Sequence, residues 1–208
     1  MLKKWQIEAG KMAALNVGVL ALQGGVAEHL DHLKRIKDVN TVPVKKPEQL
    51  EKCSGLIIPG GESTTMRKLI KNYNFVQPIK KFAQQKKIIW GTCAGLILLA
   101  SEIEGEKESQ TLGLLDIRVK RNAFGSQLNS FIEKAFVPKI SKDRQELIFI
   151  RAPLITKVGE KIDILYQKED QIAAVESEYI IATAFHPELT ESNVFHQYFV
   201  NKIIEKIK

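Results

Sequence analysis

Cys93 is the residue in this sequence whose setting best suits a nucleophile. It lies in the segment WGTCAG (residues 90–95), between an apolar run that ends at Trp90 and a second apolar run. A buried strand that turns through Gly-x-Cys-x-Gly into a helix is a nucleophile elbow, in which small neighbours permit a tight, strained turn. The start of a helix also favours the thiolate. The alternative is a buried structural cysteine between two glycines.

A cysteine nucleophile needs a general base, and histidine is the usual choice. The sequence contains four histidines: His29, His32, His186 and His196. His186 differs from the others because it directly follows an apolar strand at 180–185. Pro187 favours extended backbone there, and side chains two residues apart in extended backbone project to the same side. Glu188 can therefore accept a hydrogen bond from one imidazole nitrogen, while the other nitrogen faces the thiol.

The sequence thus predicts a catalytic triad of Cys93, His186 and Glu188. The alternative for the last two residues is a surface His-Pro turn beside a solvated glutamate. The other three histidines fall within helical segments, and we interpret them as solvated helix positions.

The segment PGGESTT (residues 59–65) also stands between an apolar run and a helical pattern. Paired glycines let backbone N–H groups approach a ligand, and a helix N-terminus adds further donors, so the segment suits an oxyanion hole. A nucleotide site is disfavoured because the Gly-Lys-Ser/Thr ending of a P-loop is missing. The alternative is an ordinary helix start, and Ser63 or Thr64 can cap that helix.

The elements that position these residues alternate between strands and helices over the first half of the chain. We expect strands at 15–22, 41–44, 55–59 and 87–90, a brief helical segment from Pro47, and helices at 26–36, from 63, at 75–86 and at 96–103. Short apolar strands separated by helices are typical of a parallel sheet that is covered on both faces.

The second half is richer in strands. We expect strands at 112–119, 127–136, 147–150, 161–166, 172–175 and 179–184, a charged loop at 101–111, and a final helix from about Glu191. The predicted fold class is α/β, a three-layer sandwich whose central, mostly parallel sheet is flanked by helices. Residues 14–208 are expected to form a single domain, preceded by an N-terminal extension at 1–13.

Composition narrows the possible functions. The 208 residues carry 31 Lys and Arg against 24 Asp and Glu, a net charge of +7. Only 6 of the cations are arginine, the residue favoured for base readout, and no basic run is interleaved with aromatic residues, so nucleic-acid binding is disfavoured. No apolar run is long enough to span a membrane. Two cysteines and the absence of a signal-peptide pattern indicate a cytoplasmic protein.

Six segments together resemble the class I (triad-type) glutamine amidotransferases, and among them the glutaminase subunits of pyridoxal phosphate (vitamin B6) synthase. These segments are LALQGGVAEH, PGGESTTMRKLI, WGTCAGLILLA, RNAFGSQLNSF, FIRAP and FHPELTE. The resemblance extends from about Val17 to the final helix.

The resemblance implies a reaction without a cofactor or metal. Cys93 attacks the carboxamide of L-glutamine, His186 transfers the proton, Glu188 orients His186, and water hydrolyses the γ-glutamyl thioester. The implied glutamine-binding residues are Gly61, Glu62, Ser63, Arg121, Ile150 and Arg151. The candidates for the oxyanion hole are Gly60, Gly61, Ala94 and Gln23.

The resemblance also implies a partner. Ammonia passes to a separate (β/α)₈-barrel synthase, whose subunits form a ring of twelve and bind up to twelve glutaminases. This chain is too short to include such a barrel, which takes about 250 residues. Docking of the partner is expected to order the loop at Gly60 and Gly61. Two alternatives remain: a catalytically silent subunit that only regulates a synthase, and a class I glutaminase or γ-glutamyl hydrolase that serves another acceptor.

Overall fold

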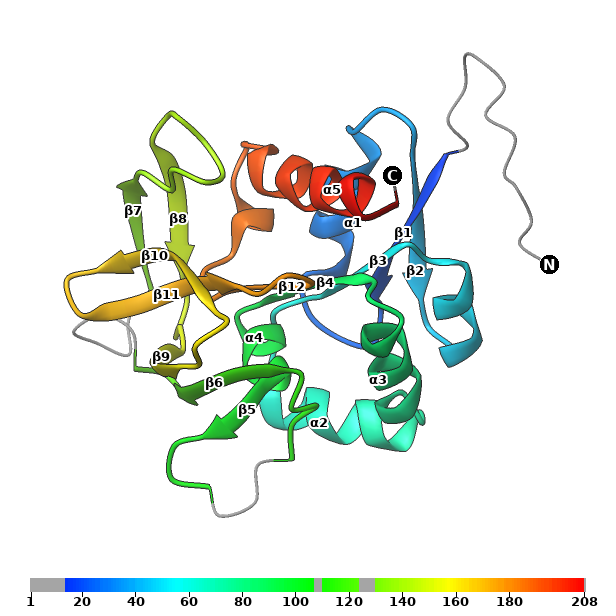
Figure 1. Ribbon diagram of the computed structural model, residues 1–208, viewed down its shortest axis with the longest axis horizontal. Helices are drawn as coiled ribbons and strands as arrows, with labels where there is room; N and C mark the ends of the chain where they lie inside the picture. Colours follow the sequence, from blue (N-terminus) through cyan, green and yellow to red (C-terminus); the bar gives the residue numbers. More distant parts are fainter. Residues whose placement is uncertain (1–13, 107–109, 124–129, 208) are drawn as a thin grey trace.

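A ten-stranded mixed sheet forms the centre of the computed structural model, which describes residues 14–106, 110–123 and 130–207 (Figure 1). Its parallel half has the strand order β2-β1-β3-β4-β12. The bounds are β1 Leu15–Leu20, β2 Val39–Val44, β3 Gly55–Ile58, β4 Ile88–Thr92 and β12 Ile180–Thr183. Every residue of β3, β4 and β12 is buried, which explains why these strands are continuous apolar runs rather than alternating ones.

Helices cover both faces of this sheet, as Figure 1 shows. One face carries α1 (Val26–Lys34) and α5 (Val194–Ile207), which contact each other. The other face carries α2 (Ser63–Asn72), α3 (Val76–Gln84) and α4 (Ala94–Leu99). A 3-10 helix, η1 (Pro47–Lys52), links β2 to β3. The three layers confirm the predicted fold class.

Beyond β12 the same sheet continues as β11-β9-β6-β5, and most of these pairings are antiparallel. The bounds are β5 Ala100–Ile103, β6 Leu115–Lys120, β9 Leu154–Val158, β10 Asp163–Lys168 and β11 Gln171–Glu176. Strand β10 pairs with β11, while β7 (Phe131–Ala135) and β8 (Gln145–Phe149) form a separate two-stranded sheet. The predicted strand-rich second half is therefore confirmed.

The structure differs from the predicted elements at three places. The helix expected at 96–103 ends at Leu99, and residues 100–103 form strand β5, so the charged loop expected at 101–111 begins with a strand. The apolar residues that precede Ser101 suit a helix, and pairing with β6 makes residues 100–103 a strand, in which Ala100 and Ile103 are buried and the two residues between them are exposed. Strand β9 was not predicted, because its burial is irregular rather than alternating. The final helix starts at Val194 instead of Glu191.

Some predictions fall outside the described residues. These are the extension at 1–13, residues 107–109 of the charged segment, and residues 124–129, which include most of the RNAFGSQLNSF segment. In the part of the chain that is described, no helix has both the length and the apolar character needed to cross a bilayer.

Candidate active site

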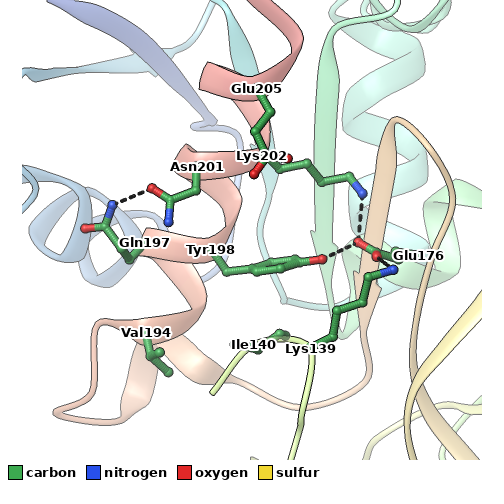
Figure 2. Close-up of a pocket in the computed structure, with 9 residues that line it drawn as sticks. All are labelled: Lys139, Ile140, Glu176, Val194, Gln197, Tyr198, Asn201, Lys202 and Glu205. Atoms are coloured by element: carbon green, nitrogen blue, oxygen red, sulfur yellow. Dashed lines mark hydrogen bonds and ion pairs between the residues drawn. The ribbon is translucent and has the colours of Figure 1, made fainter. Parts of the chain in front are cut away.

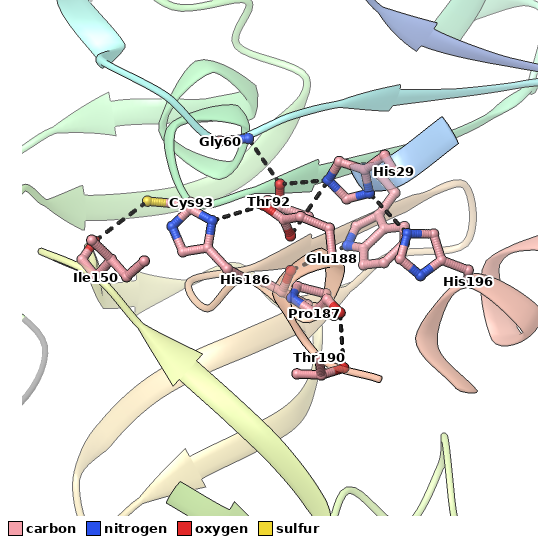
Figure 3. A network of polar contacts seen from close by, with 12 residues as sticks. His29, Gly60, Thr92, Cys93, Ile150, His186, Pro187, Glu188, Thr190 and His196 are labelled. Atoms are coloured by element: carbon pink, nitrogen blue, oxygen red, sulfur yellow. Dashed lines mark hydrogen bonds and ion pairs between the residues drawn. The ribbon is translucent and has the colours of Figure 1, made fainter. Parts of the chain in front are cut away.

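The three predicted motifs meet at one edge of the sheet. Strands β3, β4 and β12 are parallel neighbours, with Ile58 opposite Gly91 and Thr92 opposite Thr183. Their carboxyl ends therefore reach the same edge. There the glycine loop (residues 59–62) follows β3, Cys93 follows β4, and the His-Pro-Glu segment (residues 186–188) follows β12. Figure 3 shows Gly60, Cys93 and His186 close together.

Cys93 occupies the strained turn that the sequence predicts. Its backbone dihedrals are φ 47° and ψ −101°, in a region that residues with a Cβ rarely adopt. Both neighbouring glycines are required by close backbone contacts. A Cβ on Gly91 would lie 2.6 Å from backbone atoms of Gly95, and one on Gly95 would lie 2.0 Å from the carbonyl oxygen of Ile58. The turn thus presents a buried thiol, whose residue is 7% exposed, at the sheet edge.

His186 lies between the thiol and a buried carboxylate. Its Nδ1 is 2.8 Å from Oε1 of Glu188, whose side chain is 1% exposed. Burial lowers the pKa of His186, but hydrogen bonds with Cys93 and Glu188 outweigh burial and raise the pKa to about 10. At neutral pH the ring is therefore an imidazolium that faces the sulfur of Cys93.

Glu188 remains a carboxylate although it is buried. Burial raises its pKa, and the electrostatic interaction with His29 and the hydrogen bond with His186 outweigh burial, so that the pKa lies below its usual value. Residues Pro187–Leu189 form a short 3-10 helix, η2, and the N–H of His186 donates to the carbonyl oxygen of Ile148 at 2.8 Å. The triad is therefore fixed both by its side chains and by its backbone.

The glycine loop lies directly against the triad. A Cβ on Gly60 would be 2.6 Å from Cε1 of His186 and 3.3 Å from Cβ of Cys93. The N–H of Gly60, however, donates to the hydroxyl oxygen of Thr92 at 2.9 Å, so this predicted oxyanion donor is already in use. The turn at Gly24 packs against the glycine loop, since a Cβ on Gly24 would lie 1.6 Å from the carbonyl oxygen of Gly60.

The other oxyanion candidates are nearby. Gln23 lies beside Gly61, since a Cβ on that glycine would be 3.1 Å from Oε1 of Gln23. This Oε1 is buried and has no hydrogen-bond partner among the described residues. Ala94 is the first residue of α4 and immediately follows Cys93.

Glu62 caps α2, which corrects the prediction of Ser63 or Thr64. Its carboxylate accepts the N–H groups of Thr64 at 2.8 Å and Thr65 at 2.6 Å, together with the Thr65 hydroxyl at 2.7 Å. These hydrogen bonds, above all the one from the Thr65 side chain, lower the pKa of Glu62 to about 2. Ser63 is instead buried, at 8% exposure.

The predicted glutamine-binding residues come from both sides of the thiol. Arg121 lies near the start of α2, where its guanidinium is 3.4 Å from the Thr64 hydroxyl and 3.4 Å from Glu106. On the other side the thiol contacts the carbonyl oxygen of Ile150 at 3.9 Å. Arg151 follows in a left-handed conformation with φ 46° and is exposed. The structure thus places Ile150 at the thiol and Arg121 at the helix start.

Three histidines contradict the interpretation as solvated helix positions. His29 and His196 are 0% exposed and His32 is 3% exposed, because α1 and α5 pack together over the sheet. The helical spacing contained this signal: position 29 stands three residues after Val26 and four before Leu33, on the apolar stripe of α1. His29 is part of the site, since its Nε2 lies 3.5 Å from Oε2 of Glu188.

A separate pocket of about 420 Å³ lies beside α5 (Figure 2). At its wall the buried carboxylate of Glu176 contacts Lys139, and it accepts hydrogen bonds from Lys202 and the Tyr198 hydroxyl at 2.8 Å each. None of the predicted site residues lines it. Within the described ranges, no group of three or more His, Cys, Asp or Glu side chains is arranged to hold a metal ion.

Comparison with known proteins gives consistent matches over nearly the whole chain. The sequence model of the SNO glutamine amidotransferase family matches residues 19–205. A protein of Clostridium botulinum described as pyridoxal 5'-phosphate synthase subunit PdxT is 47% identical over 191 residues, which cover 92% of this chain and 98% of the relative. A protein of Halalkalibacterium halodurans with the same description is 48% identical over 191 residues, covering 92% and 96%.

Solved structures agree with these matches. A crystal structure of a glutamine amidotransferase has a TM-score of 0.83 at 41% identity, and the match covers 90% of this chain and 98% of that chain. The crystal structure of a glutamine amidotransferase from Thermotoga maritima has a TM-score of 0.60 at 14% identity, covering 95% and 86%, a likeness that concerns the fold alone.

Proposed function

The chain belongs to the SNO glutamine amidotransferase family, and from that membership we propose that it is the glutaminase subunit of a pyridoxal 5'-phosphate synthase. It hydrolyses L-glutamine to glutamate and ammonia, and it supplies the ammonia to a separate synthase subunit. The observation that carries this proposal is the alignment of Cys93, His186 and Glu188 at the sheet edge, with the sulfur and the carboxylate on opposite sides of one imidazole.

In the first half of the reaction, the Cys93 thiolate attacks the carboxamide carbon of glutamine. The C–S bond forms, and the carbonyl oxygen takes the negative charge. The backbone N–H groups of Gly61 and Ala94 are the donors we assign to that oxygen. The His186 imidazolium then gives its proton to the amide nitrogen, the C–N bond breaks, and ammonia leaves the γ-glutamyl thioester.

In the second half, His186 acts as the base. It takes a proton from water, the resulting hydroxide attacks the thioester carbon, and the C–S bond breaks to release glutamate. The thiolate and the imidazolium are then restored. Glu188 stays ionised throughout, since its charge stabilises the imidazolium and its Oε1 fixes the orientation of the ring.

The remaining site residues bind the amino-acid end of glutamine. We assign the α-carboxylate to the guanidinium of Arg121, because a guanidinium suits a carboxylate and this one lies at the start of α2. Glu62 holds the loop through its cap. The complete set of assigned glutamine-binding residues is Gly61, Glu62, Ser63, Arg121, Ile150 and Arg151.

The synthase partner in this proposal is a (β/α)₈ barrel, arranged as a ring of twelve that carries up to twelve glutaminases in the cytoplasm. The bond from the Gly60 N–H to Thr92 supports a dependence on this partner, because it holds the loop that carries Gly61, an assigned oxyanion donor, until the loop rearranges. Residues 14–208 constitute the glutaminase domain, and 1–13 are an extension.

The test combines the chain with a barrel synthase from a close relative and measures glutamate release. We expect the barrel to stimulate release strongly and Cys93→Ala to abolish it. Absence of glutamate with the barrel present would indicate a silent regulatory protein. Full release without any barrel would indicate a glutaminase that serves another acceptor. Activity that survives Cys93→Ala would contradict the assigned nucleophile.

A further inference from the structure

A row of buried side chains runs from the triad into the space between α1 and α5 (Figure 3). His29 Nε2 lies 3.5 Å from Oε2 of Glu188 and 3.2 Å from the hydroxyl oxygen of Thr92. On its other side, His29 Nδ1 lies 2.8 Å from Nε2 of His196. The ring of His196 in turn stacks on His32, with 4.3 Å between the ring centroids and 5° between their planes. His29 is thus held on both sides, and it does not touch the sulfur.

The imidazoles of His29 and His196 are both neutral at pH 7. Burial, opposed in part by the charge of Glu188, lowers the pKa of His29 to about 4. Burial and the neighbouring histidines lower the pKa of His196 well below its usual value. A neutral imidazole has one N–H donor and one acceptor nitrogen, so the orientation of this pair depends on which nitrogen carries each proton.

The buried carboxylate determines that choice. Oε1 of Glu188 pairs with His186, while Oε2 has no hydrogen-bond partner within normal distance among the described residues. A proton on Nε2 of His29 places an N–H between this oxygen, at 3.5 Å, and the hydroxyl oxygen of Thr92, at 3.2 Å, and Nδ1 can then accept the N–H of His196. The opposite tautomer would direct a lone pair at a buried anion, which is unfavourable.

We propose that His29 is a positioning residue of the active site, which holds Oε2 of Glu188 through its Nε2–H and so keeps Oε1 directed at His186. This inference deepens the proposed function and rests on it for its kinetic consequences. His29 acts through Glu188 and not on the substrate. The same nitrogen also borders the Thr92 hydroxyl, which accepts the N–H of Gly60, so His29 links α1 to the glycine loop as well.

Two amide substitutions separate this role from simple packing. In His29→Gln the amide nitrogen can occupy the place of Nε2, whereas in His29→Asn it corresponds to Nδ1 and is too short to reach Glu188. With the barrel synthase present, we expect His29→Asn to lower kcat about tenfold and leave KM unchanged, because a buried charged acceptor loses its donor. His29→Gln should retain most of kcat. Thermal unfolding establishes that both variants are folded at the assay temperature.

A second measurement needs neither glutamine nor the synthase. The rate at which iodoacetamide alkylates Cys93 is measured against pH, with the Cys93 peptide quantified by mass spectrometry so that Cys53 does not contribute. Without the donor from His29, the pKa of Glu188 rises and its charge supports the His186 imidazolium less. The thiolate then forms at higher pH, and we expect the midpoint for His29→Asn to rise by about one pH unit while His29→Gln remains near the wild type.

His196→Phe provides a variant that leaves His29 in place. It preserves a ring between the helices and removes the N–H that fixes the His29 tautomer. We therefore expect the pH midpoint of Cys93 alkylation to rise, but by less than it does for His29→Asn. This variant decides the question if His29→Asn does not fold. An unshifted His196→Phe profile, or equal profiles for the Gln and Asn variants, would overturn the inference.

The two measurements also distinguish the inference from the proposed function. If the wild type releases no glutamate with the barrel, while the alkylation midpoints differ as expected, the proposed function is wrong and the positioning of Glu188 by His29 stands. If the wild type releases glutamate and the alkylation midpoints coincide, the inference alone is wrong.

Discussion

The hydroxyl oxygen of Thr92 accepts the backbone N–H of Gly60 at 2.9 Å, so the residue just before Cys93 holds the glycine loop that lies against Cys93. Both residues are buried, and the bond connects the end of β4 to the loop after β3. The geometry of the elbow and the geometry of the glycine loop are therefore coupled through a single hydroxyl.

Thr92→Val tests this coupling, since it preserves the shape of the side chain and removes the acceptor. We expect a loss of about 1–3 kcal/mol in the free energy of unfolding, because the Gly60 N–H is left buried without a partner. Urea denaturation measures the loss. Thr92→Ser is the control, since it retains the hydroxyl, and it should be more stable than Thr92→Val. The reverse order would show that the bond contributes little.

Gly95→Ala tests the tight contact behind the elbow. A Cβ there would lie 2.0 Å from the carbonyl oxygen of Ile58, so we expect destabilisation of at least about 3 kcal/mol or failure to fold. Gly113→Ala is the matched control, because Gly113 has φ 63° but no atom within 4 Å of its Cβ position. Its cost should be only about 1–2 kcal/mol, from backbone strain alone. Equal losses of unfolding free energy in Gly95→Ala and Gly113→Ala, measured by thermal or urea unfolding, would contradict the close contact at Gly95.

Acid should destabilise the protein through His29. The pKa of this residue is lowered from 6.5 to about 4 by burial, so the unfolded chain binds a proton more readily than the folded one. The contribution of the neutral ring to stability is present above pH 6.5 and is lost as the pH falls toward 4. Urea unfolding at several pH values should show this loss, and His29→Gln, which cannot titrate, should show a shallower decline. If the free energy of unfolding falls equally with pH in the wild type and in His29→Gln, the pKa of His29 is not lowered by folding.

Arg121→Lys tests the proposed grip on the α-carboxylate of glutamine. We expect KM for glutamine to rise about tenfold or more with kcat little changed, since an ammonium cannot form the bidentate hydrogen bonds that a guanidinium makes with a carboxylate. Arg118→Lys is the control: Arg118 is half-buried on β6, where it pairs with Glu102, and its substitution should leave both constants unchanged. A fall in kcat without a change in KM for Arg121→Lys would assign that residue a different role.

The parts of this site that follow from local sequence were predictable. The turn at Cys93 needs small residues on both sides, and the pairing of His186 with Glu188 depends on a spacing of two residues; both requirements are visible in the sequence. The alternation of apolar runs and helical stripes likewise predicts the parallel half of the sheet.

The contributions of tertiary packing were not predictable in the same way. His29 and His196 belong to different helices, and only the packing of α1 against α5 brings them within 2.8 Å of each other. Their places on the apolar stripes indicated burial, but nothing local indicated Glu188 as a neighbour of His29. Strand β5 is a similar case, because it directly follows the apolar helix α4, and only its pairing with β6 shows that residues 100–103 form a strand.

The central claim is that this chain takes the amide nitrogen from glutamine and delivers it to a pyridoxal phosphate synthase. The most direct measurement supplies glutamine labelled with ¹⁵N at the amide, together with the barrel synthase and its phosphorylated sugar substrates, and determines ¹⁵N in the pyridoxal phosphate formed. We predict labelled product with the wild type. With Cys93→Ala we predict unlabelled product only, formed when ammonium is added. Unlabelled product from the wild type, or equal labelling with Cys93→Ala, would contradict the claim.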